Sequence, residues 1–400
     1  MRALSLYFLA LLSLLLDFAQ SSSNSCSKGY RLLQVQVVHR HGDRTPITPL
    51  KDEEFWSSTL ISPPWLDKIS EGTKIIRRQD EKNTHAAKGR GPFGKLTQLG
   101  LFQMVNLGTA LREDLITEEA FNRELTTKDI RVISTDFPRT IQSVQGLLIG
   151  LFPDRDLKET IEIDCRHTNW IIPDPQPRRH KEQEELELEL ASRPHMLERE
   201  EEMLPLAVRC TEGLRHLLAP EAFDVSFGVD VTEKDDTEVL PWAQLAEITK
   251  CLKVREMLPE AISVEDQETL ASHCAWRWFQ SLRHPRLAYL SMQKFAHNIC
   301  HTFKQQNEEP PLTIYSAHDS ALIGLMAAFR LEQPKTWPEY GSYIKIALLE
   351  KTNSNNEVEH VVRFYFNGDL IRSEWHGDLQ EEITLQRLSH YISTEGAEKV

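Results

Sequence analysis

The chain has 400 residues, of which 40% are hydrophobic and 26% are charged. This composition is typical of a globular protein with one large domain or two modest ones. Its formal net charge of −14 at pH 7 argues against nucleic acid or an anionic membrane surface as a partner. An acidic protein that binds an anionic ligand must concentrate positive charge locally, so clusters of arginine are informative.

The first 21 residues are predicted to be a secretory signal peptide. Arg2 precedes an apolar stretch from Ala3 to Leu16, and Ala19-Gln20-Ser21 fits a cleavage site. The apolar stretch is shorter than the ~20 residues that span a membrane, and no later segment is long or apolar enough to do so. We therefore expect a protein of the secretory pathway, secreted or in the lysosomal lumen, without a stable membrane span.

Six cysteines in a secreted chain suggest disulfide bonds. Six cysteines can pair in fifteen ways, and the sequence does not select one. No Cys-x-x-Cys or His/Cys spacing indicates a zinc site, so neither a metal nor another cofactor is expected. The cysteines are Cys26, Cys165, Cys210, Cys251, Cys274 and Cys300.

A first strand is predicted to deliver a basic cluster to a loop. Leu33, Val35, Val37 and Val38 form an apolar alternating run. The run leads directly into Arg40-His41-Gly42-Asp43-Arg44-Thr45-Pro46, in which glycine lets the backbone approach closely and proline stiffens the exit.

The aromatic loop after this cluster has two interpretations. Phe55, Trp56, Trp65 and Leu66 could form an apolar wall for an acyl chain of a substrate. Such residues are more often part of the core, and we favour the core.

Helices and strands then follow one another along the chain. Apolar spacing predicts helices after Leu96-Thr97 and after Phe137-Pro138, with strands near Ile130–Ser134 and Ile161–Ile163. Residues 178–305 are helical and strongly charged, with glutamate runs that are typical of solvated helix faces. Strands return at 311–316, 342–350 and 359–366, and a last helix is predicted at 379–393.

This order predicts an α/β fold: a mainly parallel sheet flanked by helices, with a smaller all-helical insertion. We assign residues 30–170 and 290–400 to the α/β core and residues 171–289 to the helical insertion, a cap subdomain.

A second cluster, His318-Asp319, ends the predicted strand Leu312–Ala317. Open α/β sheets place their sites at the carboxyl edge of the strands. We therefore expect His318-Asp319 and the cluster Arg40–Pro46 to meet at that edge.

These side chains suit phosphoryl transfer. Arg40 and Arg44 flank His41, and a guanidinium fork matches phosphate oxygens. A neutral His41 imidazole can attack phosphorus while the two cations stabilise charge on the equatorial oxygens. His318 can add a donor to the phosphoryl group. Asp319 can protonate the leaving oxygen and then activate water, which favours low pH because the carboxyl must start protonated.

From about residue 33 to about residue 370 the chain resembles the histidine acid phosphatases, the larger branch (branch 2) of the histidine phosphatase superfamily. Within that family, the loop from Trp56 to Pro63-Pro64 looks most like the lysophosphatidic acid phosphatases. The matching strings are Arg40–Pro46, Leu96-Thr97-Gln98-Leu99-Gly100 with Gln103, Leu107-Gly108 with Leu111-Arg112, Ser134-Thr135-Asp136 with Arg139-Thr140, Ala317-His318-Asp319 and Trp337-Pro338-Glu339-Tyr340.

The resemblance implies a histidine phosphatase-like fold and a metal-free phosphomonoesterase. It implies a phosphohistidine at His41, with Asp319 as the proton donor. By the same resemblance, Arg40, Arg44 and His318 would hold the phosphate.

One position departs from the family. The family's next phosphate-binding arginine directly precedes the Ser-Thr-Asp string, where this chain has Ile133. Arg131 lies two residues earlier on the same strand face, about 6.6 Å away, and is a candidate to bind phosphate instead. The alternative is that Arg131 is a surface residue and the site lacks one cation. The sequence favours neither.

The leading function is hydrolysis of phosphate monoesters at acidic pH, with lysophosphatidic acid or a similar small molecule as substrate. A phytase-like enzyme would share the first string, but the acidic loop Lys51-Asp52-Glu53-Glu54 does not favour a polyanionic substrate. A third interpretation, suggested by Ile133, is an impaired family member that binds phosphate ligands or partners. Intact His41 and Asp319 speak against it. The oligomeric state is open, a homodimer included.

Overall fold

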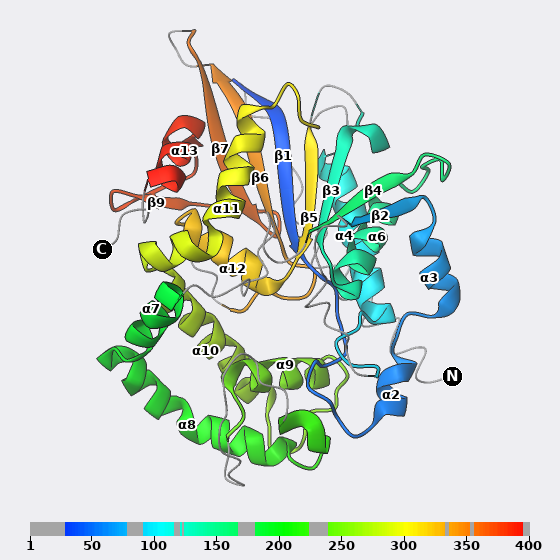
Figure 1. Cartoon of the computed structure of the whole chain (residues 1–400), viewed down its shortest axis with the longest axis vertical. Helices are drawn as coiled ribbons and strands as arrows, with labels where there is room; N and C mark the ends of the chain where they lie inside the picture. Colours follow the sequence, from blue (N-terminus) through cyan, green and yellow to red (C-terminus); the bar gives the residue numbers. More distant parts are fainter. Residues whose placement is uncertain are drawn as a thin grey trace.

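The computed structural model of the chain describes residues 29–77, 91–115, 121, 124–166, 181–223, 239–332, 336–352 and 356–394. The predicted leader, residues 1–21, lies outside them. Within the described residues one sheet forms the centre of the molecule, and helices flank it (Figure 1). A further group of helices lies beyond one end of its strands (Figure 1). The predicted α/β class is confirmed.

The central sheet of the described residues is mixed. Its strands are β1 (Tyr30–Arg40), β2 (Thr73–Arg77), β3 (Ile130–Thr135), β4 (Ile161–Arg166), β5 (Leu312–Ala317), β6 (Tyr343–Thr352), β7 (Val358–Phe366), β8 (Asp369–Ile371) and β11 (Ile383–Thr384). The order is β11-β7-β6-β1-β5-β3-β4-β2, with β8 beside β7. Neighbours are parallel from β1 to β2 and antiparallel from β1 outward through β6 and β7. Two short strands, β9 (Ser373–Trp375) and β10 (Asp378–Gln380), pair separately.

The strand that the apolar run predicted is β1, and it is buried on both faces from Gln34 onward. Val35 and Val37 belong to the core on one face of the sheet, and Val38 belongs to the core on the other. All three are fully buried. Helices on both faces explain why the parallel strands carry near-continuous apolar runs instead of a polar outer face.

Two groups of helices form these cores. On one face lie α4 (Gln98–Leu115) and α6 (Pro138–Leu151), and on the other lie α11 (Pro285–Lys304), α12 (Asp319–Ala328) and α13 (Leu385–Thr394). Helices α4 and α6 touch through their backbones, because a Cβ at Gly108 would lie 2.0 Å from the carbonyl oxygen of Leu147. The close fit fixes the position of α4, whose first turn contacts the loop after β1.

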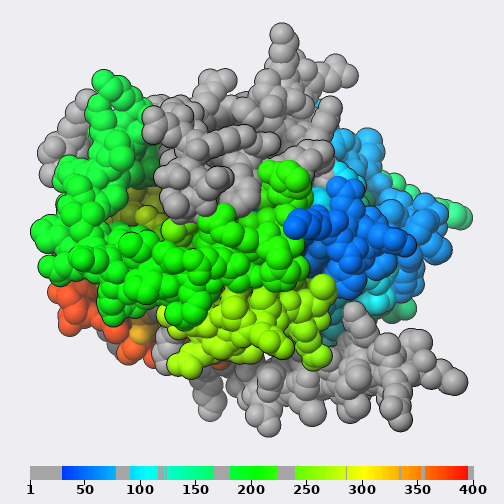
Figure 2. All heavy atoms as spheres, turned by 90° about the horizontal axis from the view of Figure 1, so that it is seen from below, coloured from blue at the N-terminus to red at the C-terminus, as the bar shows by residue number. Residues whose placement is uncertain are grey.

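Between β4 and β5 the described chain is helical. It forms α7 (Lys181–Ala191), α8 (Pro194–Leu214), α9 (Trp242–Lys253) and α10 (Val264–Leu282), which lie in the predicted insertion 171–289. Smaller elements are α2 (Glu53–Ser58), α3 (Pro63–Ser70) and the 3-10 turns Thr127–Asp129 and Pro220–Phe223. Figure 2 shows α8 and α9, in green and yellow-green, beside the blue segment that follows β1.

The segment after β1 and the helical segment share one apolar core. Trp56 is 1% exposed and packs in the same cluster as Cys210, Leu245 and Leu270. Trp56 is therefore a core residue, as the sequence favoured. This packing holds helix α9 against the loop that carries the predicted site.

The predicted disulfides are wrong for the five cysteines that the structure describes. Cys165, Cys210, Cys251, Cys274 and Cys300 are all free and buried. Burial raises the pKa of the Cys251 thiol to about 11, so these side chains act as small apolar groups. Cys26 lies outside the described residues.

No helix in the described part of the chain is long and apolar enough to cross a membrane.

Candidate active site

Three parallel strands end at the same edge of the sheet. In register, Arg40 at the end of β1 pairs with Ala317 at the end of β5, and Ser134 near the end of β3 pairs with Ser316. The residues that follow therefore meet: the ring centroids of His41 and His318 lie 5.6 Å apart. The structure brings together the two clusters that the sequence placed at this edge.

His41 is buried in a form that leaves one nitrogen available. Its Nδ1 lies 2.8 Å from the carbonyl oxygen of Gly42. A carbonyl can only accept, so Nδ1 carries the proton and the Nε2 lone pair of a neutral ring is free. Burial, and then the Arg139 and Arg40 guanidiniums, hold the pKa of His41 well below its usual value. The ring is therefore neutral, as a nucleophile must be.

The loop that carries His41 is seated directly on helix α4. A Cβ at Gly42 would lie 2.2 Å from the carbonyl oxygen of Gly100, so no larger residue fits without moving the backbone. The Gly42 N–H donates to Ser143 Oγ at 3.1 Å, and the Asp43 N–H donates to Gln103 Oε1 at 2.8 Å. These contacts fix the backbone between the flanking arginines.

Arg40 connects the first cluster to Asp319. Its Nη2 lies 2.7 Å from Asp319 Oδ2, and its Nη1 donates to the carbonyl of Pro338 at 2.5 Å. The Trp337 indole also donates to Asp319 Oδ2, at 2.8 Å. Burial opposes the charged carboxylate, but Arg40 and then Trp337 outweigh it and hold the pKa of Asp319 well below its usual range.

Arg44 is held by a residue of the helical segment. Its Nη1 pairs with Glu247 Oε2 at 2.8 Å, and Glu247 also accepts the backbone N–H groups of Ile47 and Thr48. Arg44 is 5% exposed. Glu247 lies on α9, about 200 residues along the chain, and sequence reasoning did not find it because no local pattern links the two segments.

His318 takes its orientation from two threonines. The Thr140 hydroxyl donates to carbonyl oxygens, and the Thr135 hydroxyl donates to Thr140 Oγ1 at 2.9 Å. Since each hydroxyl has one proton, His318 Nε2 must donate to Thr135 Oγ1, 3.1 Å away. Burial and Arg139 hold the pKa of His318 well below its usual value, so Nδ1 of the neutral ring is an acceptor.

Comparison with known proteins shows which family the chain resembles. Residues 31–188 match the model of the histidine phosphatase superfamily, branch 2. The predicted resemblance to this family of phosphatases is therefore confirmed over that part of the chain.

Curated relatives match the chain to different extents. Counting factor 60 of Dictyostelium discoideum is 26% identical over 367 residues, which cover 85% of this chain and 80% of that protein. Lysophosphatidic acid phosphatase type 6 of Homo sapiens is 32% identical over 133 residues, which cover 30% of this chain and 31% of that protein.

A solved structure shares the fold over nearly the whole chain. The apo phytase of Hafnia alvei superposes with a TM-score of 0.59 and covers 92% of this chain and 97% of its own. At 13% sequence identity this likeness shows the fold alone.

The structure does not bring Arg131 into the cluster. Arg131 pairs with Thr313 in register, four residues before Ala317, which corresponds to about 13 Å along the strand. Its Nη1 instead lies 2.8 Å from Glu309 Oε2. Ile133 is 1% exposed in the apolar core. The candidate role of Arg131 in phosphate binding is therefore corrected: of the two alternatives for Arg131, the structure supports the one in which it lies away from the phosphate position.

A different arginine, Arg139, lies in the cluster, and sequence reasoning gave it no role. It belongs to the first turn of α6, which begins directly after the end of β3. Its Cζ lies 4.6 Å from the Phe137 ring, whose centroid is 5.0 Å from that of His318. Among the charges that lower the pKa of His41 and of His318, Arg139 is the strongest. The signal was present, since Pro138 starts a helix at this edge.

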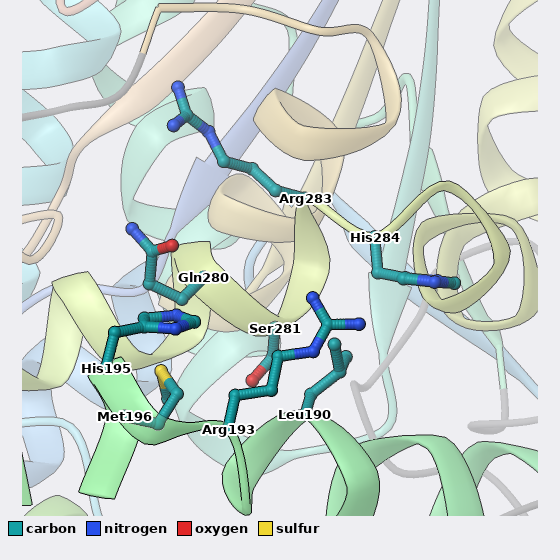
Figure 3. Close-up of a pocket in the computed structure, with 8 residues that line it drawn as sticks. All are labelled: Leu190, Arg193, His195, Met196, Gln280, Ser281, Arg283 and His284. Atoms are coloured by element: carbon teal, nitrogen blue, oxygen red, sulfur yellow. The ribbon is translucent and has the colours of Figure 1, made fainter.

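A separate cavity of about 300 Å³ lies where α7 and α8 meet the turn between α10 and α11 (Figure 3). None of the predicted site residues lines it. The residues that line it are Leu190, Arg193, His195, Met196, Gln280, Ser281, Arg283 and His284.

Proposed function

We propose that the protein hydrolyses phosphate monoesters at acidic pH through a phosphohistidine on His41. The observation that carries the proposal is the buried neutral ring of His41, with Nδ1 bound to the Gly42 carbonyl and Nε2 free. Guanidinium groups of Arg40 and Arg139 lie close enough to act on its pKa. A neutral nucleophile among cations suits attack on a phosphate anion.

In the first step, His41 Nε2 attacks phosphorus and forms an N–P bond. The bond from phosphorus to the ester oxygen breaks, and that oxygen takes the proton of the Asp319 carboxyl. The products are an alcohol, the phosphohistidine and the Asp319 carboxylate.

In the second step, the Asp319 carboxylate takes a proton from water as the water oxygen attacks phosphorus. The N–P bond breaks, which releases inorganic phosphate and restores neutral His41 and protonated Asp319. The Arg40–Asp319 ion pair favours the carboxylate, so the first step is expected to need acidic pH. An acidic lumen of the secretory pathway, as the leader suggests, would supply it.

We assign phosphate binding to Arg40, Arg44 and Arg139. His318, which the sequence predicted as a further donor to the phosphate, gives its only proton to Thr135 in the neutral form. Arg40 and Arg44 come from the loop after β1, and Arg139 comes from the adjacent helix α6. Arg139 supplies the cation that Ile133 does not. One well-placed cation or donor at such a site contributes roughly 2–4 kcal/mol to stabilisation of the transition state.

The identity of the substrate is supported by fewer observations than the reaction. Lysophosphatidic acid is a candidate because a relative that matches 30% of the chain carries that name. The aromatic residues after the first cluster do not add support, since Trp56 is core and Trp65 packs edge-to-face on Phe102 at 5.1 Å. We therefore propose phosphate monoesters as the class.

The decisive assay is turnover of p-nitrophenyl phosphate near pH 5 by the wild type and by His41→Ala. We expect hydrolysis that depends on His41, is unaffected by EDTA, and leaves acid-labile radiolabel on the protein when the phosphate is labelled. If no turnover depends on His41, the protein is instead a family member that binds phosphate ligands without hydrolysing them.

A further inference from the structure

Helix α9 presents one face to the predicted catalytic loop. Glu247, Cys251 and Arg255 follow at four-residue spacing, and therefore lie on one side of the helix and its extension. Glu247 pairs with Arg44, Cys251 Sγ lies 3.5 Å from the carbonyl of Arg44, and Arg255 pairs with Asp43 at 2.7 Å. The proposed mechanism uses none of these α9 side chains.

Lys250 lies on the same helix and is more unusual. Its side chain is 9% exposed, and Nζ lies 2.8 Å from Glu339 Oε2. Glu339 is 71% exposed, and an ion pair with such a solvated carboxylate contributes little. Glu339 therefore does not balance the cost of burying an ammonium group. An ammonium has three donors, and the ion pair with Glu339 uses one.

Lys250 is placed beside the proton-donor end of the proposed site. Its Nζ lies 5.0 Å from the centroid of the Tyr340 ring, and Arg40 Cζ lies 4.2 Å from the same centroid. The His41 ring is 5.8 Å from that centroid. The Tyr340 ring is thus a common neighbour of Lys250, Arg40 and His41. Because both cations lie within 5.0 Å of its centroid, Lys250 and Arg40 are themselves close to each other.

The groups around Lys250 lie on the side of the site where the leaving group would depart. Lys250 is faced by Arg40 from β1, by Glu339 and Tyr340 from the segment before β6, and by Asp319 from α12. Burial lowers the pKa of Lys250 to about 8, with Arg40 acting in the same direction, while Glu339 and Asp319 act against both. Asp319 is the group that meets the ester oxygen in the proposed first step.

We infer that Lys250 determines specificity by binding a second anionic group on the alcohol part of the substrate, next to the ester carbon. The inference rests on the proposed function, because it takes Asp319 to mark the leaving oxygen. An anion there would accept hydrogen bonds from the remaining donors of Lys250. It would also balance the charge of the Lys250 ammonium, which the exposed Glu339 balances poorly. Esters of neutral alcohols, such as lysophosphatidic acid, would gain nothing from it.

Two esters isolate this contribution. Glycerol 2-phosphate and 2-phosphoglycerate carry phosphate on the same carbon and differ only in one neighbouring group, CH2OH against carboxylate. The quantity to measure is the ratio of kcat/KM for 2-phosphoglycerate to that for glycerol 2-phosphate. Comparing this ratio between variants cancels the chemical difference between the esters.

We expect Lys250→Gln to lower the ratio by about ten-fold, the size of one charge-assisted hydrogen bond. Glu339→Gln removes the carboxylate that competes with the substrate anion for Lys250, so it should raise the ratio by a few-fold. This variant also tests the inference if Lys250→Gln fails to fold. Lys253→Gln is the matched control, since Lys253 lies on the same helix but pairs with Glu268 at 2.9 Å. Its ratio should equal that of the wild type.

An unchanged ratio in Lys250→Gln, or an equal loss for both esters, would overturn the inference, as would a ratio that does not rise in Glu339→Gln. A lack of any His41-dependent hydrolysis would overturn the proposed function instead. In that case calorimetry on the full chain would compare the Kd values of the two esters. A preference for 2-phosphoglycerate that Lys250→Gln does not reduce would then overturn the role of Lys250.

Discussion

Arg40 donates from Nη2 to Oδ2 of Asp319 across 2.7 Å, so one guanidinium contacts both the proposed phosphate-binding cluster and the proposed proton donor. The ion pair favours the charged carboxylate, which cannot give a proton. A phosphate ester that draws hydrogen bonds from Arg40 would weaken this hold and raise the pKa of Asp319. Substrate binding and protonation of the donor would thus be linked through Arg40.

The first prediction concerns the need for a proton on the leaving oxygen. Asp319→Asn should lower kcat by about 10²–10⁴ for glycerol 2-phosphate, because an alkoxide is a poor leaving group without general acid catalysis. The loss for p-nitrophenyl phosphate should be much smaller, since p-nitrophenolate leaves without protonation. Equal losses for the two esters in steady-state assays would contradict the assignment. Ser320→Ala, one residue along helix α12, is the control.

The second prediction concerns the pH profile. Trp337→Phe removes the indole N–H that donates to Asp319 Oδ2 at 2.8 Å. The carboxylate then loses a donor, so the pKa of Asp319 rises and the protonated form persists to higher pH. The alkaline limb of kcat/KM should move upward by up to about one pH unit.

A packing control accompanies this measurement. Trp278 lies edge-to-face on Trp337 at 5.5 Å, but the indole that donates to the Asp319 carboxyl is that of Trp337. Trp278→Phe should lower stability without moving the alkaline limb. A downward shift in Trp337→Phe, or the same shift in both variants, would show that the indole hydrogen bond does not set the pKa of Asp319.

The third prediction separates the two arginines. Arg139→Met should lower kcat/KM for phosphate esters by about 10²-fold, the effect of deleting one preorganised donor. Arg131→Met should leave kcat/KM unchanged, because Arg131 pairs with Glu309 away from the cluster. That pair is 36% and 23% exposed, so its loss should cost less than about 1 kcal/mol of stability. Thermal unfolding and steady-state kinetics on both variants test this, and a reversed order of kinetic effects would refute it.

The sequence predicted that the two clusters of the candidate site meet, because two local patterns and one geometric rule sufficed. Apolar runs placed strands before Arg40 and before His318, and parallel strands bring their carboxyl ends to one edge. The structure agrees, with Arg40 and Ala317 in register. The α/β class followed from the same runs.

The predictions that failed concerned contacts that local sequence patterns do not determine. Alternation put Arg131 on the expected face, but not at the expected height, and its guanidinium found Glu309 instead. Glu247 and Lys250 contact residues far away in sequence, and nothing local marks such contacts. The expected disulfides failed because an even count of cysteines cannot tell paired sulfurs from separately buried ones, such as Cys251.

The last prediction concerns the charge of Lys250. Burial lowers the pKa of Lys250 to about 8, so the ammonium is present below that pH and is lost above it. In the wild type, the preference for 2-phosphoglycerate over glycerol 2-phosphate should therefore hold from pH 5 to 7 and decline as pH rises through 8. Profiles of kcat/KM report the free enzyme, so the decline should follow the pKa of the unliganded protein.

Lys250→Arg provides the matched variant, because a guanidinium stays charged throughout this range. Its preference should persist at pH 9, where that of the wild type has faded. Arg40 is also permanently charged, and Asp319 acts on both esters alike, so neither can produce a decline in the ratio near pH 8. If the preference of Lys250→Arg declines at the same pH as that of the wild type, the titrating group is not Lys250.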